Sequence, residues 1–322
     1  MCAPPLLSDA ERLIAARAAQ AGSPSPSPFG PDDQIGMLNL ITPESRRRVL
    51  ENVDPGRVFD LSVDYFVGMP SWTANGDMSF QIWLNHTPAG TLIDDSPGVG
   101  RAINERVSYS GDSIAMYTHT GTHIDALCHW GYGGTIWNGF TEGEHLGSRQ
   151  WTVAGADRQP PIVARGVLLD VAGLHEVDDL PDSHPIGPAD LDAACTRQKV
   201  ELQPGDVVLV RTGRMNRWPS VSGYLAPSPG LNLDGAAFLA ETGAIVIGAD
   251  NVALEVIPPE TTDHWSPVHT YLLAECGVAI LELAWLEELA AAKVYEFAFV
   301  GACMRIRGAT GAPIRPLAMA FR

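Results

Sequence analysis

Cysteine is scarce in this sequence, and no two cysteines are closely spaced. The 322 residues contain five cysteines, at positions 2, 128, 195, 276 and 303. An odd number of scattered cysteines in a long chain argues against a disulfide framework. We therefore expect a reducing, cytoplasmic location.

Basic residues are also few. Lys and Arg total 21 against 38 Asp and Glu, which gives a formal net charge of -17. Because binding to phosphates requires a basic surface, this balance argues against a nucleic-acid partner. The same negative charge disfavours an anionic membrane surface.

Long hydrophobic runs are missing as well. No stretch of about 20 consecutive apolar residues occurs, so no membrane span is expected. The first residues, MCAPPLLSDAERL, lack the basic region and apolar run of a signal peptide. With 45% hydrophobic and 18% charged residues, the composition is typical of a soluble globular protein.

A Ser/Pro-rich segment at 22–31, GSPSPSPFGP, follows a short amphipathic pattern at 9–21. The amphipathic pattern predicts a helix begun by Ser8. The Ser/Pro-rich segment predicts an extended arm that either packs on another subunit or forms a mobile surface tail. We expect residues 1–31 to form this N-terminal helix and arm, and residues 32–322 to form one domain.

Short apolar strands and helices share the rest of the chain, which predicts a mixed α/β (α+β) fold. Helices are expected at 43–53, 188–198, 234–242, 267–276 and 286–292. Strands are expected at 58–63, 80–85, 162–171, 206–211, 244–247, 278–283, 294–300 and 316–321.

Three strong metal ligands lie within seven residues: His119, His123 and Asp125. In a helix Asp125 would point away from the two histidines, whereas an extended strand directs all three side chains to one face. Gly121 falls between the histidines on that face, where it would leave room for an ion. Imidazole and carboxylate ligands suit zinc, manganese or iron(II), and three protein ligands with an open position are typical of a catalytic metal.

The run His119-Thr-Gly-Thr-His123-Ile-Asp125-Ala-Leu-Cys-His129 resembles the signature H-x-G-T-H-x-D-x-x-x-H of the bacterial cyclase-family metal hydrolases. This family includes kynurenine formamidases, isatin hydrolases and relatives that act on lactones or cyclic amides. Weaker similarities occur at 60–62, 165–170, 205–213 and 248–250, and at 33–39, which resembles the N-terminal extension of longer members. Two departures are Leu127, where many members have Pro, and an interval from His269 to Glu282 that is one residue longer than in short members.

The resemblance implies a single domain of the swivelling β/β/α type, with a barrel-like sheet flanked by helices. It implies that His119, His123 and Asp125 bind a first ion, and that one or two ions of Zn2+ or Mn2+ are present. The residues that complete the site are then His129, His269 and Glu282.

The implied activity is hydrolysis of an amide-type C–N bond in a small molecule, such as a cyclic amide or imide or an aryl formamide. Lactone hydrolysis by the same centre is the alternative. A homodimer or homotetramer is expected.

The second half of the site has its own sequence signals. Ser266 and Pro267 predict the start of a helix, which places His269 in its first turn. Glu282 lies inside an apolar strand, where a carboxylate is costly unless it is paired or bound to metal. Because histidine titrates near neutral pH, His129 or His269 is the candidate proton donor to the leaving group.

Aromatic residues near the motif could line a pocket for an aromatic substrate, with core packing as the alternative interpretation. These residues are Trp72, Trp130, Tyr132 and Trp137.

Two other functions would use parts of the same pattern. His123, Asp125 and His269 would satisfy the two-histidine, one-carboxylate triad of a non-haem iron oxygenase, but His119 would then have no role. A non-enzymatic protein with a structural metal would require a closed shell of four ligands.

Overall fold

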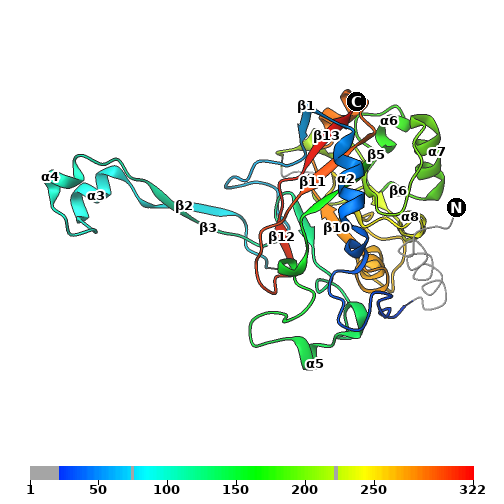
Figure 1. The fold of residues 1–322 in the computed structure, drawn as a ribbon, viewed down its shortest axis with the longest axis horizontal. Helices are drawn as coiled ribbons and strands as arrows, with labels where there is room; N and C mark the ends of the chain where they lie inside the picture. Colours follow the sequence, from blue (N-terminus) through cyan, green and yellow to red (C-terminus); the bar gives the residue numbers. More distant parts are fainter. Residues whose placement is uncertain (1–21, 74–75, 221–223) are drawn as a thin grey trace.

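A curled nine-stranded sheet organises the residues that the computed structural model describes, which are 22–73, 76–220 and 224–322. The sheet curls into a half-barrel with helices on its flanks (Figure 1), so the predicted mixed α/β class is confirmed. From one edge to the other, its strands are β1 (Val53–Asp60), β13 (Leu317–Phe321), β11 (Glu296–Gly301), β5 (Ile162–Asp170), β7 (Val207–Arg211), β9 (Val246–Ala249), β10 (Ala279–Glu282), β4 (His123–Asp125) and β12 (Gly311–Pro313).

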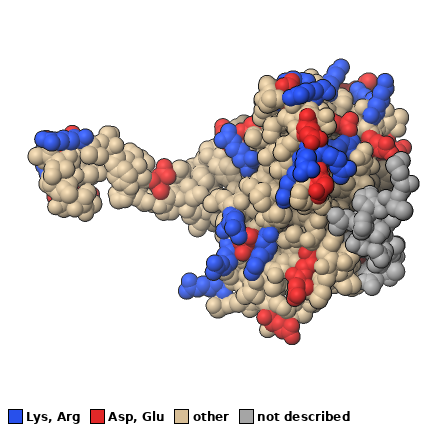
Figure 2. Space-filling model, in the orientation of Figure 1, with Lys and Arg blue, Asp and Glu red and all other residues tan. Residues whose placement is uncertain are grey.

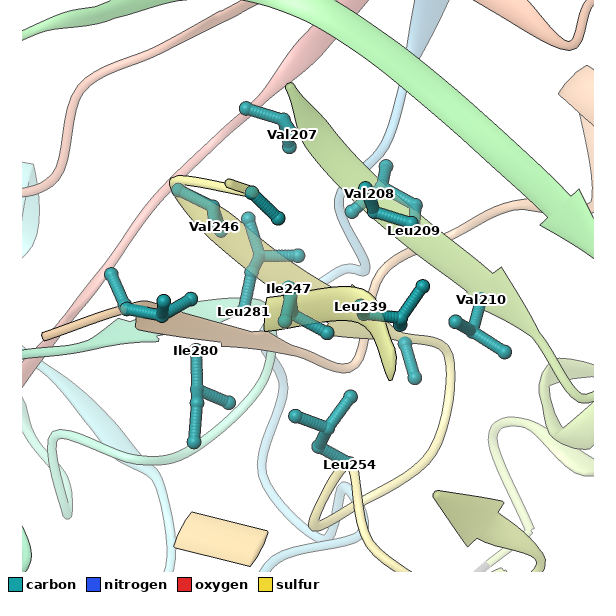
Figure 3. Close-up of a cluster of buried hydrophobic side chains, with 14 of the residues drawn as sticks. Val207, Val208, Leu209, Val210, Leu239, Val246, Ile247, Leu254, Ile280 and Leu281 are labelled. Carbon is teal, nitrogen blue, oxygen red and sulfur yellow. The ribbon is translucent and has the colours of Figure 1, made fainter. Parts of the chain in front are cut away.

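The centre of the sheet is parallel and mostly apolar. Strands β5, β7, β9 and β10 pair in parallel, and the remaining neighbours pair antiparallel. Parallel strands covered on both faces read as continuous hydrophobic runs, as in Val207–Arg211, where every residue is buried. Figure 3 shows Val208, Ile247 and Leu281 packed together with Leu239 from a covering helix.

Short helices cover the sheet, and two of them begin where local signals predict. Thr42 caps α2 by accepting a hydrogen bond from the backbone of Ser45, and Pro188 begins α7 as expected. The α-helices are α2 (Pro43–Glu51), α3 (Pro88–Asp94), α4 (Arg101–Asn104), α5 (Glu142–His145), α6 (Val171–Leu174), α7 (Pro188–Gln198), α8 (Leu233–Glu241), α9 (Pro267–Thr270) and α10 (Glu287–Ala291). The 3-10 helices are η1 (Gly36–Leu40), η2 (Trp137–Gly139), η3 (Ala156–Arg158) and η4 (Arg214–Arg217), and η5 (Tyr271–Glu275) is a π-helix.

A long hairpin arm projects from the body (Figure 1). Its stem is the antiparallel pair β2 (Gln81–His86) and β3 (Gly111–Ala115), and its tip carries α3 and α4. The sequence predicted only the first of these strands. A second small sheet pairs β6 (Pro185–Ile186) with β8 (Gly230–Leu231).

Residues 22–31 lie along the body of their own chain. The backbone N–H of Ser25 donates to the carbonyl of Ala274, and that of Ser27 donates to the side chain of Asn138. The helix predicted at 9–21 lies outside the described residues. None of the helices in the described part of the chain has the length and apolar character needed to cross a membrane.

Candidate metal centre

The centre is built around a cross-strand pair. His123 on β4 lies directly opposite Glu282 on β10 in the antiparallel register. Side chains of opposed residues leave the same face of a sheet, so the imidazole and the carboxylate meet there. Nε2 of His123 lies 3.2 Å from Oε2 of Glu282 and 3.5 Å from Oδ1 of Asp125, and all three side chains are buried.

His119 reaches the same site by a turn, and the expectation of a continuous strand from 119 to 125 is wrong. Only His123–Asp125 forms a strand, and Gly121 has a φ of +63°, in the left-handed region that favours glycine. The ring of Tyr65 fills the space beside Gly121, so that a Cβ on residue 121 would lie 2.6 Å from this ring. Gly121 therefore permits a turn that returns His119 to the site, and it does not clear space for an ion.

A close backbone on β12 holds the ring of His119. A Cβ on Gly311 would lie 2.5 Å from Cε1 of His119, so only glycine lets the imidazole pack there. Nε2 of His119 lies 2.9 Å from the hydroxyl of Thr310, and Nδ1 lies 2.7 Å from Oδ1 of Asp125. Nδ1 is thus the nitrogen that faces the centre.

His129 joins the centre by stacking on His119. The two ring centroids are 3.8 Å apart and the planes are inclined by 21°. Burial, together with His119, holds the pKa of His129 well below its ordinary value, so this imidazole is neutral at pH 7.

His269 enters from the first turn of α9, as predicted. Its Nε2 lies 3.1 Å from Oε1 of Glu282 and 3.7 Å from Oδ2 of Asp125. The π-helix η5 follows α9, with the backbone N–H of Cys276 donating to the carbonyl of Tyr271. A π turn takes up one residue more than an α turn, so η5 lengthens the chain between His269 and Glu282 by one residue relative to a regular helix.

The second ring nitrogens of His123 and His269 have fixed partners. Nδ1 of His123 lies 2.8 Å from the carbonyl of Gly121, so it carries the proton and leaves Nε2 to face the centre. Nδ1 of His269 lies 2.6 Å from Oε1 of Glu255, which also accepts from the hydroxyl of Ser266. A carboxylate behind a histidine in this way is typical of metal-binding histidines.

Three buried polar atoms at the centre lack a hydrogen-bond partner among the described residues. They are Nε2 of His123, Oδ2 of Asp125 and Oε1 of Glu282. They come from side chains whose other polar atoms are engaged, and they converge on one place. Buried polar groups are nearly always satisfied, so this set fits a divalent ion that would bind all three.

The charges of the centre lead to the same conclusion. Burial alone would lower the pKa of His123, but Asp125 and Glu282 outweigh burial and raise it to about 10. Likewise Glu255 and Glu282 raise the pKa of His269 well above its ordinary value, against the effect of burial. Without an ion, protons on these imidazoles balance the carboxylates, which is the role that a bound cation would take.

The ligand atoms fall into two groups that share Asp125. One group is His119, Asp125 and His129, and the other is His123, Asp125 and Glu282, with ligand atoms within 4.8 Å of one another in each group. This grouping differs from the one that the resemblance implies, in which His119 and His123 hold the same ion.

The four aromatic residues expected around the substrate lie in different places. Trp130 is at the centre, with its ring centroid 5.7 Å from those of His129 and His269 and 4.5 Å from that of Trp265. Trp137 is fully buried and donates from Nε1 to Asp33, so the expectation that it contacts substrate is wrong.

The other two aromatic residues, Tyr132 and Trp72, have their contacts with residues other than the histidines of the metal centre. Tyr132 donates its hydroxyl to Glu275, at 2.5 Å, and its ring lies 6.4 Å from that of His264. Trp72 packs against a small apolar cluster that includes Val63 and Leu283.

Several residues of the centre were missed from sequence. Glu255 interrupts the apolar run Val252-Ala-Leu-Glu-Val256, the same signal that identified Glu282. Thr310 and Gly311 gave no local signal, because nothing in the sequence shows that β12 lies beside β4. Trp265 is 70% exposed next to Trp130, and an exposed tryptophan cannot be recognised from sequence.

Known proteins resemble this chain in sequence and in fold. The sequence matches the model of the family named Cyclase over residues 59–256. A crystal structure described as a novel cyclase is 30% identical, with a TM-score of 0.79, over 90% of this chain and 97% of that one.

More distant structures share the fold. Isatin hydrolase A from Ralstonia solanacearum is 20% identical, with a TM-score of 0.62, over 82% of this chain and 92% of its own. A predicted metal-dependent hydrolase from Bacillus stearothermophilus is 21% identical, with a TM-score of 0.53, over 82% and 98%. No curated protein matches the sequence.

Proposed function

Because this chain belongs to the cyclase family, we propose that it is a metal-dependent hydrolase that cleaves an amide-type C–N bond in a small molecule. The observation that carries the proposal is the convergence of three buried atoms, from His123, Asp125 and Glu282, that make no hydrogen bond among the described residues. Fold relatives described as isatin hydrolase and as a metal-dependent hydrolase support the reaction class.

The proposed ligands are those of the predicted set. His123, Asp125, His269 and Glu282 would hold one ion, and His119, Asp125 and His129 offer ligand atoms for another. Nitrogen and carboxylate ligands suit Zn2+ or Mn2+. When bound, such an ion supplies Lewis acidity and lowers the pKa of a water molecule.

The chain itself would move the proton. His269 has neighbours at both ring nitrogens, whereas neither ring nitrogen of His129 has a hydrogen-bond partner among the described residues. His129 is also kept neutral by burial and by His119. We therefore assign His129 the transfer of a proton from the attacking water to the leaving nitrogen, when it is not itself bound to an ion.

Trp130 and Trp265 favour a flat, aromatic or cyclic substrate. The ring of Trp130 lies against His269, and Trp265 extends this apolar surface to solvent. Aromatic rings bind flat substrates by stacking or edge-to-face contact. This surface supports an aryl formamide or a cyclic amide over an open-chain aliphatic amide.

The deciding experiment is a substrate panel with controlled metal. The protein is stripped with a chelator and then assayed with Zn2+ or Mn2+ on an aryl formamide, isatin, a cyclic imide and a lactone. We expect hydrolysis of at least one amide substrate that depends on added metal. Hydrolysis of the lactone alone would establish the alternative substrate class, and no metal-dependent hydrolysis of any compound would contradict the proposal.

An iron oxygenase that uses His123, Asp125 and His269 is the alternative of another class. It would leave His119 and Glu282 without a role, although both contact this centre. Activity with Zn2+ under anaerobic conditions would eliminate the oxygenase, because oxygen is its substrate.

We also propose that the protein works as a homodimer or homotetramer whose hairpin arms contact neighbouring copies. Half of the large exposed hydrophobic side chains of the described residues lie between 81 and 115. Figure 2 shows few charged side chains along this stem. A two-stranded hairpin is marginal by itself in water, so a protein partner would stabilise it.

A further inference from the structure

A second group of metal-binding side chains lies outside the metal centre. His175 caps the end of α6, His184 directly precedes β6, and Asp190 lies in the first turn of α7. Nε2 of His175 is 2.8 Å from Oδ1 of Asp190, and Nε2 of His184 is 3.8 Å from Oδ2. All three ligand atoms lie within 4.8 Å of one another.

These distances suit a small transition-metal ion. Two ligand atoms that each lie about 2.1 Å from a tetrahedral zinc are about 3.4 Å apart. The observed separations of 2.8 Å and 3.8 Å lie on either side of that value, so small side-chain movements would produce the geometry. Two imidazoles and one carboxylate are ligands that zinc, copper and nickel accept.

One atom of the cluster is buried without a partner. Nε2 of His184 has no hydrogen-bond partner among the described residues, although it points toward the carboxylate of Asp190. The rings of His175 and His184 pack edge to face, with centroids 5.2 Å apart. The side chain of His175 is 38% exposed, so an ion can reach the cluster from solvent.

Backbone hydrogen bonds fix the positions of both histidines. The N–H of His175 donates to Val171, that of His184 donates to Pro181, and the carbonyl of His184 accepts from Gly230. Strand β5, which leads into α6, is separated from β10 by β7 and β9, so three strand spacings, about 14 Å, lie between them. The cluster is therefore independent of the metal centre.

We propose that His175, His184 and Asp190 bind a divalent transition-metal ion, with zinc as the probe. The ion would join the end of α6, the turn before β6 and the start of α7. Its role is to hold these elements together, since no polar residue of the metal centre takes part.

Zinc content tests the proposal. His184→Phe keeps a ring beside His175 and removes the nitrogen ligand, and His145→Phe is the matched control because His145 lies outside both groups of ligands. The full-length proteins are equilibrated with the same free zinc and their metal content is measured. We expect one zinc ion fewer per chain in His184→Phe than in the wild type or the control, with unchanged hydrolase activity. Equal zinc content in all three proteins would overturn the proposal.

A second variant and a thermal measurement cover the case in which His184→Phe does not fold. Asp190→Asn removes the carboxylate charge and keeps the side-chain shape. Zinc should raise the Tm of the wild type more than that of Asp190→Asn, because an ion that binds only the folded chain stabilises it. The same zinc-dependent rise in both proteins would mean that the cluster is only a hydrogen-bonded pair with a neighbouring histidine.

Discussion

Oε1 of Glu255 lies 2.6 Å from Nδ1 of His269, so a buried carboxylate fixes the imidazole whose other nitrogen faces the metal centre. Glu255→Gln keeps a hydrogen-bond acceptor but removes the charge. Loss of such a partner weakens metal binding by about 10- to 100-fold, and we expect a loss of this size in a competition titration with a chelator. Glu260→Gln, at an exposed position nearby, is the control. Equal metal affinity for Glu255→Gln and the wild type would show that Glu255 does not position His269.

His123→Ala removes the imidazole that lies opposite Glu282. Because the metal would supply several kcal/mol of transition-state stabilisation, the loss of kcat/KM should be at least about 1,000-fold. Bound metal is measured on the same sample, and His145→Phe serves as the control. A chelator should abolish the activity of the wild type to the same extent. Full activity of His123→Ala would contradict the assignment of the centre.

Gly311→Ala tests whether the ring of His119 requires a bare backbone beside it. The added Cβ would lie 2.5 Å from the imidazole, so His119 must move away from Asp125. We expect weaker metal binding and a lower kcat, and a smaller change in Tm. Gly143→Ala is the matched control, since nothing lies within 4 Å of its Cβ. If both variants bind metal as the wild type does, the close packing of His119 has no functional role.

The buried carboxyl of Asp250 should make the stability of the protein depend on pH. Burial raises the pKa of this carboxyl from 3.8 to about 6, although it accepts hydrogen bonds from Thr212 and Gly213. An acid whose folded pKa is raised binds its proton more tightly in the folded state, so its contribution to stability is full below pH 3.8 and is lost as the pH rises through 6. Relative to Asp250→Asn, the free energy of unfolding of the wild type should fall by roughly 3 kcal/mol over that range. Denaturant unfolding at several pH values measures it, and parallel pH profiles for the two proteins would refute the raised pKa.

Substitutions in the hairpin arm should change the oligomeric state of the protein. Leu84 on the stem is 57% exposed and Ile93 at the tip is 81% exposed. Leu84→Lys together with Ile93→Lys should shift an oligomer toward monomers in analytical ultracentrifugation. Leu50→Lys, at an apolar position on α2 that is 48% exposed, should not. A wild-type protein that sediments as a monomer would rule out the proposed role of the arm.

The sequence predicts the first part of the centre well because its ligands lie close together. Four of its ligand residues lie within eleven consecutive positions, so the motif alone identifies them: His119, His123, Asp125 and His129. Alternation along a strand predicts that these side chains share one face; they do converge, but His119 returns by a turn at Gly121 instead of lying on a strand. The alternation of side chains along an expected strand does not reveal that one residue has a left-handed backbone conformation.

The remaining parts of the centre depend on long-range packing. Glu255 contacts His269 because the segment around residue 255 packs against the start of α9. Gly311 contacts His119 because β12 pairs with β4. The sequence gives the character of each segment, but it does not give the order of strands in the sheet. For the same reason, Trp137 was expected near the substrate, although it packs in the core beside Gly277.

Among the described residues, strand β4 pairs with β10 and β12, and both lie far toward the C-terminus. During synthesis the segment from His119 to His129 leaves the ribosome well before Glu282, so its strand has no partner at that stage. Metal capture by the complete centre therefore has to wait until most of the chain has been made and β10 has joined the sheet. A truncated or stalled product would carry the signature motif in full and still be unable to bind metal as the mature protein does.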